Sequence, residues 1–474
     1  MIRSRRSLAL ALLVACSPRT QSTTAPTTTA PEPTSDVEAT ETPAGACPAV
    51  ATPQSSAGRQ LDRLVAAINA ADDAPAKDFV AKEMSTSFRE HAPLERHLQF
   101  IRGMHGDGPP VLVCRVESDT DDEIVALLGG HDDKGAAEFG RMFVRIDREG
   151  KVDGLGLERA TADDISRPIA ALDAAATTRI VDEIAKGLDE YVFADVRDEM
   201  AARIRKAAQA GDYASITSPR ALATRLTTDL RAVSHDKHLS VVYSSAPIPP
   251  QTEGAEPPPE ELARFKEQAA RDNFGIPVAE IREGGIGYLD IRGFLPVDIA
   301  ADAIATQLSK IADAKVLVID LRNNGGGDPA GVARMCSYFF GKKKVHLNDI
   351  YTRSENRTEK FFTAPDAPGQ HYGGKKPIYV LTSARTFSGG EEFAYNLKTQ
   401  KRATLVGETT GGGAHPTKLV RIDEHWGVAL PHARAINPIT KTNWEGTGVK
   451  PDVEVPAAQA LDKALELAAA KKPR

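Results

Sequence analysis

The chain has 474 residues, of which 26% are charged, and a formal net charge of −6. This length is sufficient for about three domains with sizeable cores. The charge is weak and spread along the chain, which excludes an electrostatic case for binding nucleic acid or an acidic ligand. The four cysteines form no CxxC pair and the eleven histidines show no HExxH-like spacing, so the sequence predicts neither a metal site nor a cofactor.

Residues 1–16 contain three early arginines, a short apolar stretch and the segment Leu-Val-Ala-Cys that ends at Cys16. This resembles a bacterial lipoprotein signal with its lipobox, which implies cleavage before Cys16 and a lipid on its thiol. The apolar stretch is too short to span a membrane. We expect an exported protein, lipid-anchored in the cell envelope and facing the periplasm or the exterior, at the outer membrane if the cell is Gram-negative. The alternative is an ordinary secretory signal with an incidental cysteine.

Residues 17–57 are dominated by Ser, Thr, Pro and Ala, a composition that cannot bury enough apolar surface to fold. They predict a disordered tether. An oxidising compartment would allow Cys47 to pair with Cys114, and the sequence leaves this pairing open. Cys336 lies in an apolar, helical stretch and is predicted to be buried.

Residues 58–160 predict a small α+β accessory domain, because apolar residues at helical spacing come first and strand-like runs follow. The helix is predicted from Leu61, Leu64, Val65 and Ile68, and the strands from the runs at 111–118, 123–130 and 140–158. The order faintly resembles the cone-shaped nuclear transport factor fold. No catalytic constellation is found here, and the histidines are interpreted as surface or satisfied core residues: His91, His97, His105 and His131.

Residues 161–245 predict a helical bundle. Ile180, Ile184 and Leu188 recur every four residues, and Ser218-Pro219 is a favourable helix start. The segment ends in SHDKHLSVVY, where a strand pattern begins directly after His238. A lone histidine at such a junction is more often a structural polar residue, unless another part of the chain requires a base.

Residues 246–285 predict a Pro-rich insertion and connector, with an exposed flexible loop over 246–261. A layered α/β core is predicted over 286–470, beginning with a strand at 286–291, a helical spacer and a buried strand at 316–322. The turn NNGGGDP follows. Its glycines let the backbone approach a ligand closely and offer N–H groups to an oxyanion hole, although a flexible turn is the alternative.

The segment from Thr386 to Lys398 places Ser388 between an apolar strand and an amphipathic helix. At a helix N-terminus, unpaired N–H groups and the helix dipole can hold an oxyanion, which acyl transfer requires. This layout suits the nucleophile of a serine hydrolase. The alternative is a simple N-cap in which Glu391 completes a capping box.

Five motifs follow one another in order: HDKHLSV, LVIDLRNNGGG, TSARTFSGGEEFAYNLK, RATLVGETTGGGAHP and NWEGTGVKPDVEV. Together they resemble the tail-specific protease superfamily, in particular the branch with interphotoreceptor retinoid-binding protein and tricorn-type peptidases. The resemblance covers about residues 165 to 470. It implies an α/β fold with a crotonase-like ββα core, preceded by an N-terminal helical bundle.

The resemblance also implies roles for individual residues. Ser388 corresponds to the nucleophile, with Gly389 and the Gly325-Gly326 turn as oxyanion hole. The lysine that serves as base in carboxy-terminal processing proteases is absent, because GETTGGGAHP occupies its region. Tricorn instead uses a histidine and a glutamate, which correspond here to His238 as general base and Glu445 as a carboxylate that orients this histidine or its neighbours. Where tricorn has a serine before that histidine this chain has Lys237, and two rival bases follow the glycine run: His415 and Lys418.

Two functions are compatible with these residues. The first is an exported serine endopeptidase that hydrolyses peptides or unfolded protein segments through an acyl-enzyme. The second is a non-catalytic binder of retinoid or other apolar ligands in the same fold. The sequence leaves open the cleavage preference and the oligomeric state.

Overall fold

The computed structural model describes residues 47–89, 94–104, 109–120, 122–131, 135–166, 172–245, 247–250 and 258–470. Cys16 and most of the predicted tether lie outside these residues. The described chain forms two compact units. The first contains residues 174–215 and 223–470, and the second contains residues 47–173 and 216–222, apart from the gaps named above. No helix of the described segments is long and apolar enough to cross a membrane.

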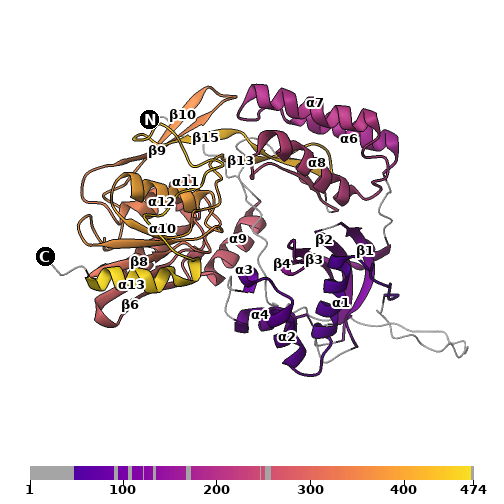
Figure 1. Cartoon of the computed structure of the whole chain (residues 1–474), viewed down its shortest axis with the longest axis horizontal. Helices are drawn as coiled ribbons and strands as arrows, with labels where there is room; N and C mark the ends of the chain where they lie inside the picture. Colours follow the sequence, from indigo (N-terminus) through magenta and orange to yellow (C-terminus); the bar gives the residue numbers. More distant parts are fainter. Residues whose placement is uncertain are drawn as a thin grey trace, which may run out of the picture. The chain divides into compact units, whose positions relative to one another are not determined.

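The second unit combines helices with a four-stranded antiparallel sheet in the order β1-β2-β3-β4 (Figure 1). The predicted helix and strands are confirmed, because α1 buries Leu61 and Leu64 in the same core as Ile124 and Val144 of the sheet. The elements are α1 (Ser56–Ile68), α2 (Ala74–Lys82), α3 (Thr86–Arg89), α4 (Leu94–Arg102), β1 (Leu112–Asp119), β2 (Glu123–His131), β3 (Ala137–Ile146), β4 (Val152–Ala160) and α5 (Ala162–Ser166).

A disulfide joins Cys47 to Cys114 of β1, with their Cα atoms 5.5 Å apart. The pairing that the sequence left open is therefore present in the structure. His97 is buried, and its Nε2 lies 3.0 Å from the carbonyl oxygen of Arg89, as expected for a satisfied core residue. His91 and His105 lie outside the described residues.

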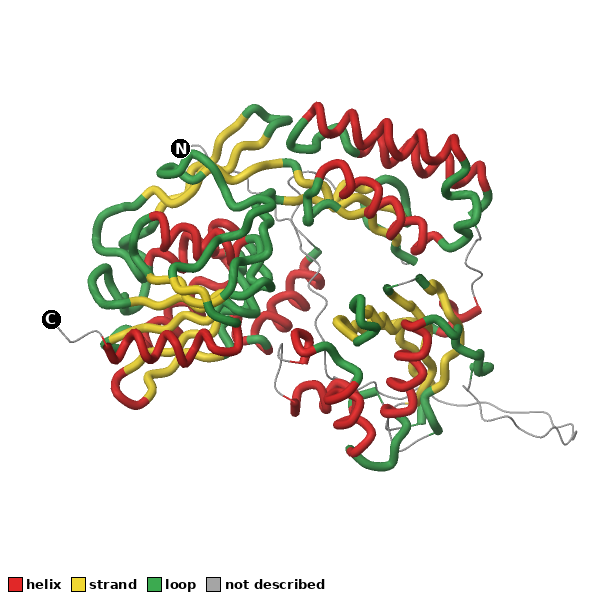
Figure 2. Tube along the Cα trace, viewed as in Figure 1, coloured by secondary structure: helices red, strands yellow, loops and turns green. Residues whose placement is uncertain are grey.

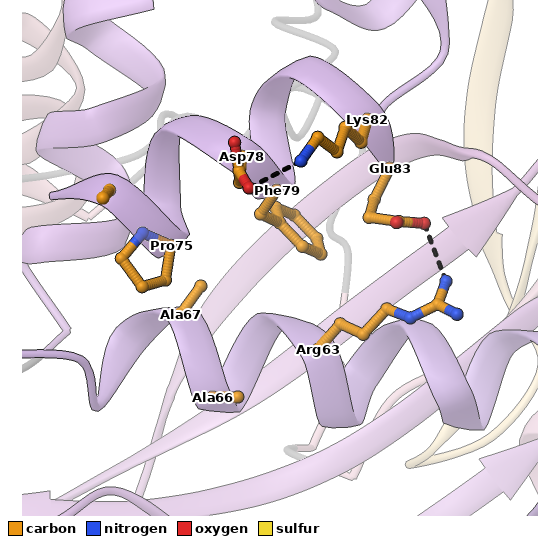
Figure 3. Close-up of a pocket in the computed structure, with 9 residues that line it drawn as sticks. Arg63, Ala66, Ala67, Pro75, Asp78, Phe79, Lys82 and Glu83 are labelled. Atoms are coloured by element: carbon orange, nitrogen blue, oxygen red, sulfur yellow. Dashed lines mark hydrogen bonds and ion pairs between the residues drawn. The ribbon is translucent and has the colours of Figure 1, made fainter.

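A cavity of about 540 Å³ lies between α1 and α2 (Figure 3). Its walls include Phe79 and several alanines, and its charged side chains are paired. Arg63 contacts Glu83 at 2.7 Å and Lys82 contacts Asp78 at 2.7 Å. No sequence motif described above falls on these residues.

The first unit begins with helices, as predicted for this part of the chain. These are α6 (Ala174–Gly187), α7 (Ala194–Ala210) and α8 (Pro219–Ser234), the last of which starts at the predicted proline and has its first residues in the second unit. Ile180 and Ile184 of α6 are buried. A short strand, β5 (Ser240–Tyr243), follows His238 and pairs with β14 (Trp426–Pro431), which also pairs with β13 (Thr417–Arg421).

The predicted exposed loop over 246–261 is only partly correct. Ile248 is 7% exposed, its N–H donates to the carbonyl oxygen of Glu424, and its own carbonyl accepts from Arg421 Nε. An apolar side chain among the prolines thus attaches the segment to the β13–β14 hairpin. The connector also contains the helix α9 (Pro259–Arg271), which begins at a proline of the insertion and was not predicted.

The core sheet has six strands in the order β16-β12-β11-β8-β7-β6, all parallel except β6. Its strands are β6 (Val278–Arg282), β7 (Ile286–Asp290), β8 (Val316–Asp320), β11 (Ile378–Thr382), β12 (Thr404–Gly407) and β16 (Val453–Glu454). The central strands read as continuous apolar runs because they are covered on both faces.

Helices cover both faces of this sheet (Figure 2). One core cluster combines the sheet with α10 (Val297–Ile311), α11 (Pro329–Ser337) and α12 (Gly389–Thr399), and a second packs α13 (Ala460–Ala470) on the opposite face. A separate small sheet has the order β10-β9-β15, from β9 (His346–Thr352), β10 (Arg357–Phe362) and β15 (Ala433–Ile436). Cys336 of α11 is buried, as predicted. The fold class is thus mixed α/β, as expected.

Candidate active site

Ser388 lies at the turn that joins strand β11 to helix α12, as predicted. It is the N-cap of α12 and adopts φ 52° and ψ −118°. A positive φ is unfavourable for a residue with a side chain, so the surrounding structure must hold this turn. Strained turns of this kind, immediately before a helix, are found where an enzyme exposes a nucleophilic serine.

The glycine turn after β8 packs directly against Ser388. Strands β8 and β11 are parallel neighbours, so the turns at their carboxyl ends meet at one edge of the sheet. A Cβ atom on Gly326 would lie 2.7 Å from the Cβ atom of Ser388 and 2.8 Å from the nitrogen of Gly389. This contact is closer than a real Cβ atom tolerates, so it requires glycine at position 326.

The amides available to an oxyanion differ from the prediction. The N–H of Gly325 donates to the carbonyl oxygen of Arg292 at 3.3 Å, and that of Gly326 donates to Asn324 Oδ1 at 2.9 Å. In the structure, the N–H groups of Gly325 and Gly326 are thus already used in hydrogen bonds within the chain. The N–H groups of Gly327 and Gly389 have no acceptor among the residues that the structure describes.

Glu391 connects the Ser388 turn to the second glycine run. Its carboxylate accepts the N–H of Ser388 at 2.9 Å, the hydroxyl of Thr410 at 2.5 Å, and the N–H groups of Gly412 and Gly413 at 2.6 and 2.8 Å. Burial raises the pKa of Glu391, while these four hydrogen bonds act in the opposite direction. The predicted capping box is present, and it also fixes the loop that leads to His415.

We expect Glu391→Gln to lower the free energy of unfolding by about 2 to 4 kcal/mol. The carboxylate is fully buried, and an amide nitrogen in its place would face N–H groups that need an acceptor. Chemical denaturation measures the change. The matched control is Glu466→Gln on α13, where the side chain is 67% exposed and pairs only with Lys463, so a change within about 0.5 kcal/mol is expected. Equal stability of the wild type and Glu391→Gln would contradict the role given to Glu391.

His238 lies beside the nucleophile turn. Its ring centroid is 4.6 Å from that of Phe387, the residue before Ser388, and its Cε1 atom would meet a Cβ atom on Gly413 at 2.6 Å. Its Nδ1 atom is buried and has no hydrogen-bond partner within the described chain. Burial lowers the pKa of His238 to about 4, so the imidazole is neutral at pH 7. A neutral imidazole is the form that accepts a proton.

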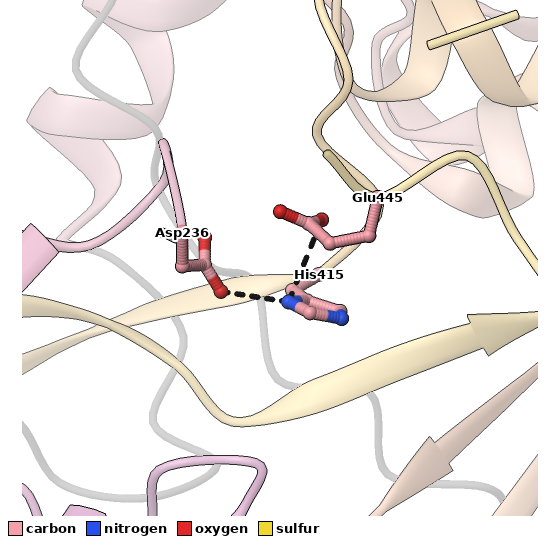
Figure 4. Close-up of side chains that lie close together, drawn as sticks. All are labelled: Asp236, His415 and Glu445. Atoms are coloured by element: carbon pink, nitrogen blue, oxygen red, sulfur yellow. Dashed lines mark hydrogen bonds and ion pairs between the residues drawn. The ribbon is translucent and has the colours of Figure 1, made fainter. Parts of the chain in front are cut away.

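Within the described residues, Glu445 makes no ion pair or hydrogen bond with His238. It lies instead beside His415, whose Nδ1 atom is 2.7 Å from Asp236 Oδ2 and 3.5 Å from Glu445 Oε2 (Figure 4). Glu445 Oε2 also accepts the N–H of Ala414 at 2.5 Å. Burial raises the pKa of Glu445 to about 7, so this carboxylate is partly protonated at neutral pH.

The group of Asp236, His415 and Glu445 is the main feature that the sequence did not reveal. Asp236 precedes His238 by only two residues in HDKHL, but its partner His415 is 179 residues away. The ligand atoms of the three side chains lie within 4.8 Å of one another, a donor set that would suit a divalent cation such as Zn²⁺. In the structure the His415 nitrogen of that set is hydrogen-bonded to Asp236.

The two lysines near the site have other partners. Lys418, the second rival base, pairs with Glu190 at 2.7 Å. Lys237 donates to the carbonyl oxygen of Gly411 at 2.5 Å. Of the two rival bases, only His415 therefore stands in the buried network around Asp236.

A serine on a strained turn, free amides beside it and buried imidazoles with carboxylates together form a site of the serine-hydrolase type. Residues 285–455 match the family described as "Peptidase family S41", and residues 164–271 match the "N-terminal domain of Peptidase_S41 in eukaryotic IRBP". The predicted resemblance is confirmed, and these two segments belong to peptidase family S41.

Curated relatives carry related names. The chain is 33% identical over 174 residues to a chloroplastic C-terminal processing peptidase of Tetradesmus obliquus, a match that covers 36% of this chain and 35% of the relative. It is 29% identical over 191 residues to a carboxy-terminal-processing protease of Bartonella bacilliformis, covering 39% and 42%. The chain thus spans well under half the length of these relatives.

Among solved structures, a lipoprotein from Streptococcus agalactiae matches with a TM-score of 0.42 and 15% sequence identity. The match covers 64% of this chain and 98% of that one.

Proposed function

We propose that the chain is a serine endopeptidase that cleaves peptide bonds in peptides or unfolded protein segments through an acyl-enzyme on Ser388, with His238 as general base. The observation that carries the proposal is the strained turn that puts Ser388 against the glycine turn after β8, with the His238 ring packed at a tilt against the adjacent Phe387. Membership of family S41 supports it.

The reaction would proceed in two steps. The hydroxyl proton of Ser388 passes to neutral His238 while the oxygen forms a bond to the carbonyl carbon of the substrate. The peptide C–N bond then breaks, and the leaving amine takes the proton from His238. In the second step, water gives a proton to His238 and attacks the ester, which releases the acid and restores the Ser388 hydroxyl.

The oxyanion of the intermediate requires two donors. We assign the N–H groups of Gly389 and Gly327 to this task, in place of Gly325 and Gly326. The nitrogen of Gly327 is 3.0 Å from the position of a Cβ atom on Gly389, so the glycine turn after β8 and the Ser388 turn pack against each other at these two residues. The dipole of α12 adds to the stabilisation of negative charge there.

Hydrolysis of a disordered polypeptide such as casein by the purified chain tests this function. Cleavage by the wild type and its absence in Ser388→Ala are expected. Saturable retinoid or fatty-acid binding by a folded chain that cleaves nothing would instead favour the non-catalytic alternative. The crotonase-like description of the 286–470 core and an accessory role for residues 58–160 are part of the same proposal.

We also infer that the chain is exported and lipid-anchored through Cys16, which lies outside the described residues. The Cys47–Cys114 disulfide supports export, because such bonds persist in oxidising compartments. In a bacterial host, we expect metabolic labelling with an alkyne fatty acid to mark the wild type in the membrane fraction. Cys16→Ser should abolish labelling, whereas Cys336→Ser, a buried thiol, should keep it. Labelling that persists in Cys16→Ser would contradict the anchor.

A further inference from the structure

Asp236 is a buried carboxylate that lacks a permanent cationic partner. It is 1% exposed, and no lysine or arginine of the described segments lies within 4.0 Å of it. Its acceptors are used by the Tyr191 hydroxyl at 3.3 Å, the N–H of His238 at 3.0 Å and Nδ1 of His415 at 2.7 Å. A buried carboxylate is stable only if hydrogen-bond donors compensate it, and among the described residues the His415 ring makes the shortest of these contacts.

The two oxygens of Asp236 serve different histidines. Oδ1 holds the backbone of His238, and Oδ2 holds the ring of His415 (Figure 4). Among the described residues, the Nδ1 atom of the His238 ring has no hydrogen-bond partner. We propose that Asp236 and His415 are positioning residues of the reaction, a buried pair that fixes the His238 segment and places a second imidazole beside the first. This inference rests on the proposed function.

The loop that carries His415 is tied to the nucleophile by a second carboxylate. One oxygen of Glu391, Oε2, accepts the N–H groups of both Ser388 and Gly413, which lies two residues before His415. Asp236 thus attaches His415 to the His238 segment, and Glu391 attaches the same loop to the Ser388 turn. These three segments are therefore held together around Ser388.

The charges that act on His238 come from several elements. Burial contributes most to its lowered pKa, Asp236 opposes the shift, and His415 and Arg231 add to it. Tyr191 and Glu445 face Asp236 and His415 rather than His238. Replacing His415 with a neutral residue removes a group that lowers the pKa of His238 and keeps Asp236, which raises it. Both effects favour the protonated form of His238, so its pKa should rise.

Histidine NMR titration tests this without requiring activity. In the full chain carrying Ser388→Ala, in the presence of EDTA, the His238 signal is assigned by its loss in His238→Gln. We expect His415→Gln to raise the titration midpoint of His238 by roughly one pH unit. Tyr191→Phe removes an uncharged donor to the same carboxylate and should leave the midpoint unchanged. His415→Asn serves as a second variant if His415→Gln does not fold.

An unchanged or lower midpoint in the folded His415 variant would overturn the proposal, as would an equal rise in Tyr191→Phe.

The pH dependence of Ser388 labelling by a fluorophosphonate then separates the claim about the Asp236–His415 pair from the proposed peptidase function. In His415→Gln, the pH at which labelling is half-lost on the acid side should rise by the same amount as the NMR midpoint of His238. A wild type that never labels, with the NMR shift present, refutes the peptidase function but keeps the pair; labelling without any shift refutes the pair alone.

Discussion

Replacing Ser388 with alanine is expected to lower peptide hydrolysis by on the order of 10³-fold or more, because no other group can form the acyl-enzyme. The fold should survive. An N-cap serine is worth about 1 kcal/mol, and the Ser388 N–H keeps its bond to Glu391 in the variant. Steady-state cleavage of a fluorogenic peptide, compared at equal folded concentration, measures the effect.

Ser383 provides the matched control on the same turn. Its hydroxyl donates to the carbonyl oxygen of Arg322 at 2.5 Å and accepts the N–H of Arg385 at 3.1 Å, so its role is structural. Ser383→Ala should lower the free energy of unfolding by about 1 to 2 kcal/mol and leave the rate per folded molecule close to that of the wild type. If Ser388→Ala cleaved as fast as Ser383→Ala, the assignment of the nucleophile would be wrong.

Replacing His238 with glutamine is expected to reduce the rate of peptide hydrolysis by about 10² to 10⁴-fold relative to the wild type. The change removes the proton acceptor and keeps a side chain of similar volume. The exchange should change stability little, because the buried Nδ1 atom has no partner to lose among the described residues. A rate in His238→Gln within a few-fold of the wild type would transfer the role of base to His415.

The pH profile identifies the base independently. A base acts in its neutral form, so activity falls as the pH drops through its pKa in the folded protein. Burial lowers the pKa of His238 to about 4, whereas that of Glu445 is raised to about 7. In Glu445→Gln the acid limb of kcat/KM should therefore lie near pH 4. A limb that remains near the ordinary histidine pKa of about 6.5 would contradict His238 as the base.

The sequence was sufficient to predict those helices, strands and turns that depend on the spacing of nearby residues. Apolar periodicity located α1, α12 and the strand β11, and the order of strand and helix placed Ser388 at a helix start. The glycine turn could be expected near Ser388 because parallel neighbouring strands end at one edge of their sheet. The helix α9 was missed although Leu262, Phe265 and Ala269 lie at helical spacing, because the proline-rich and acidic run before them was interpreted as an exposed loop.

What the sequence could not provide depends on contacts between distant side chains. The bond of the Gly326 N–H to Asn324 Oδ1 removes a donor that the motif alone seemed to offer. The Asp236–His415 contact joins residues 179 positions apart, and Glu445 lies beside the same His415 ring. Such pairings follow from the packing of three loops, and no periodicity or spacing encodes them.

Mass-spectrometric mapping of a fluorophosphonate adduct on the folded chain tests the central claim most directly. The proposed mechanism predicts a single adduct on the peptide that contains Ser388, formed faster in the wild type than in His238→Gln. It predicts no adduct in Ser388→Ala and undiminished labelling in Ser383→Ala. A folded wild-type chain that acquires no adduct, or acquires it on another serine, would contradict the claim that Ser388 is an activated nucleophile.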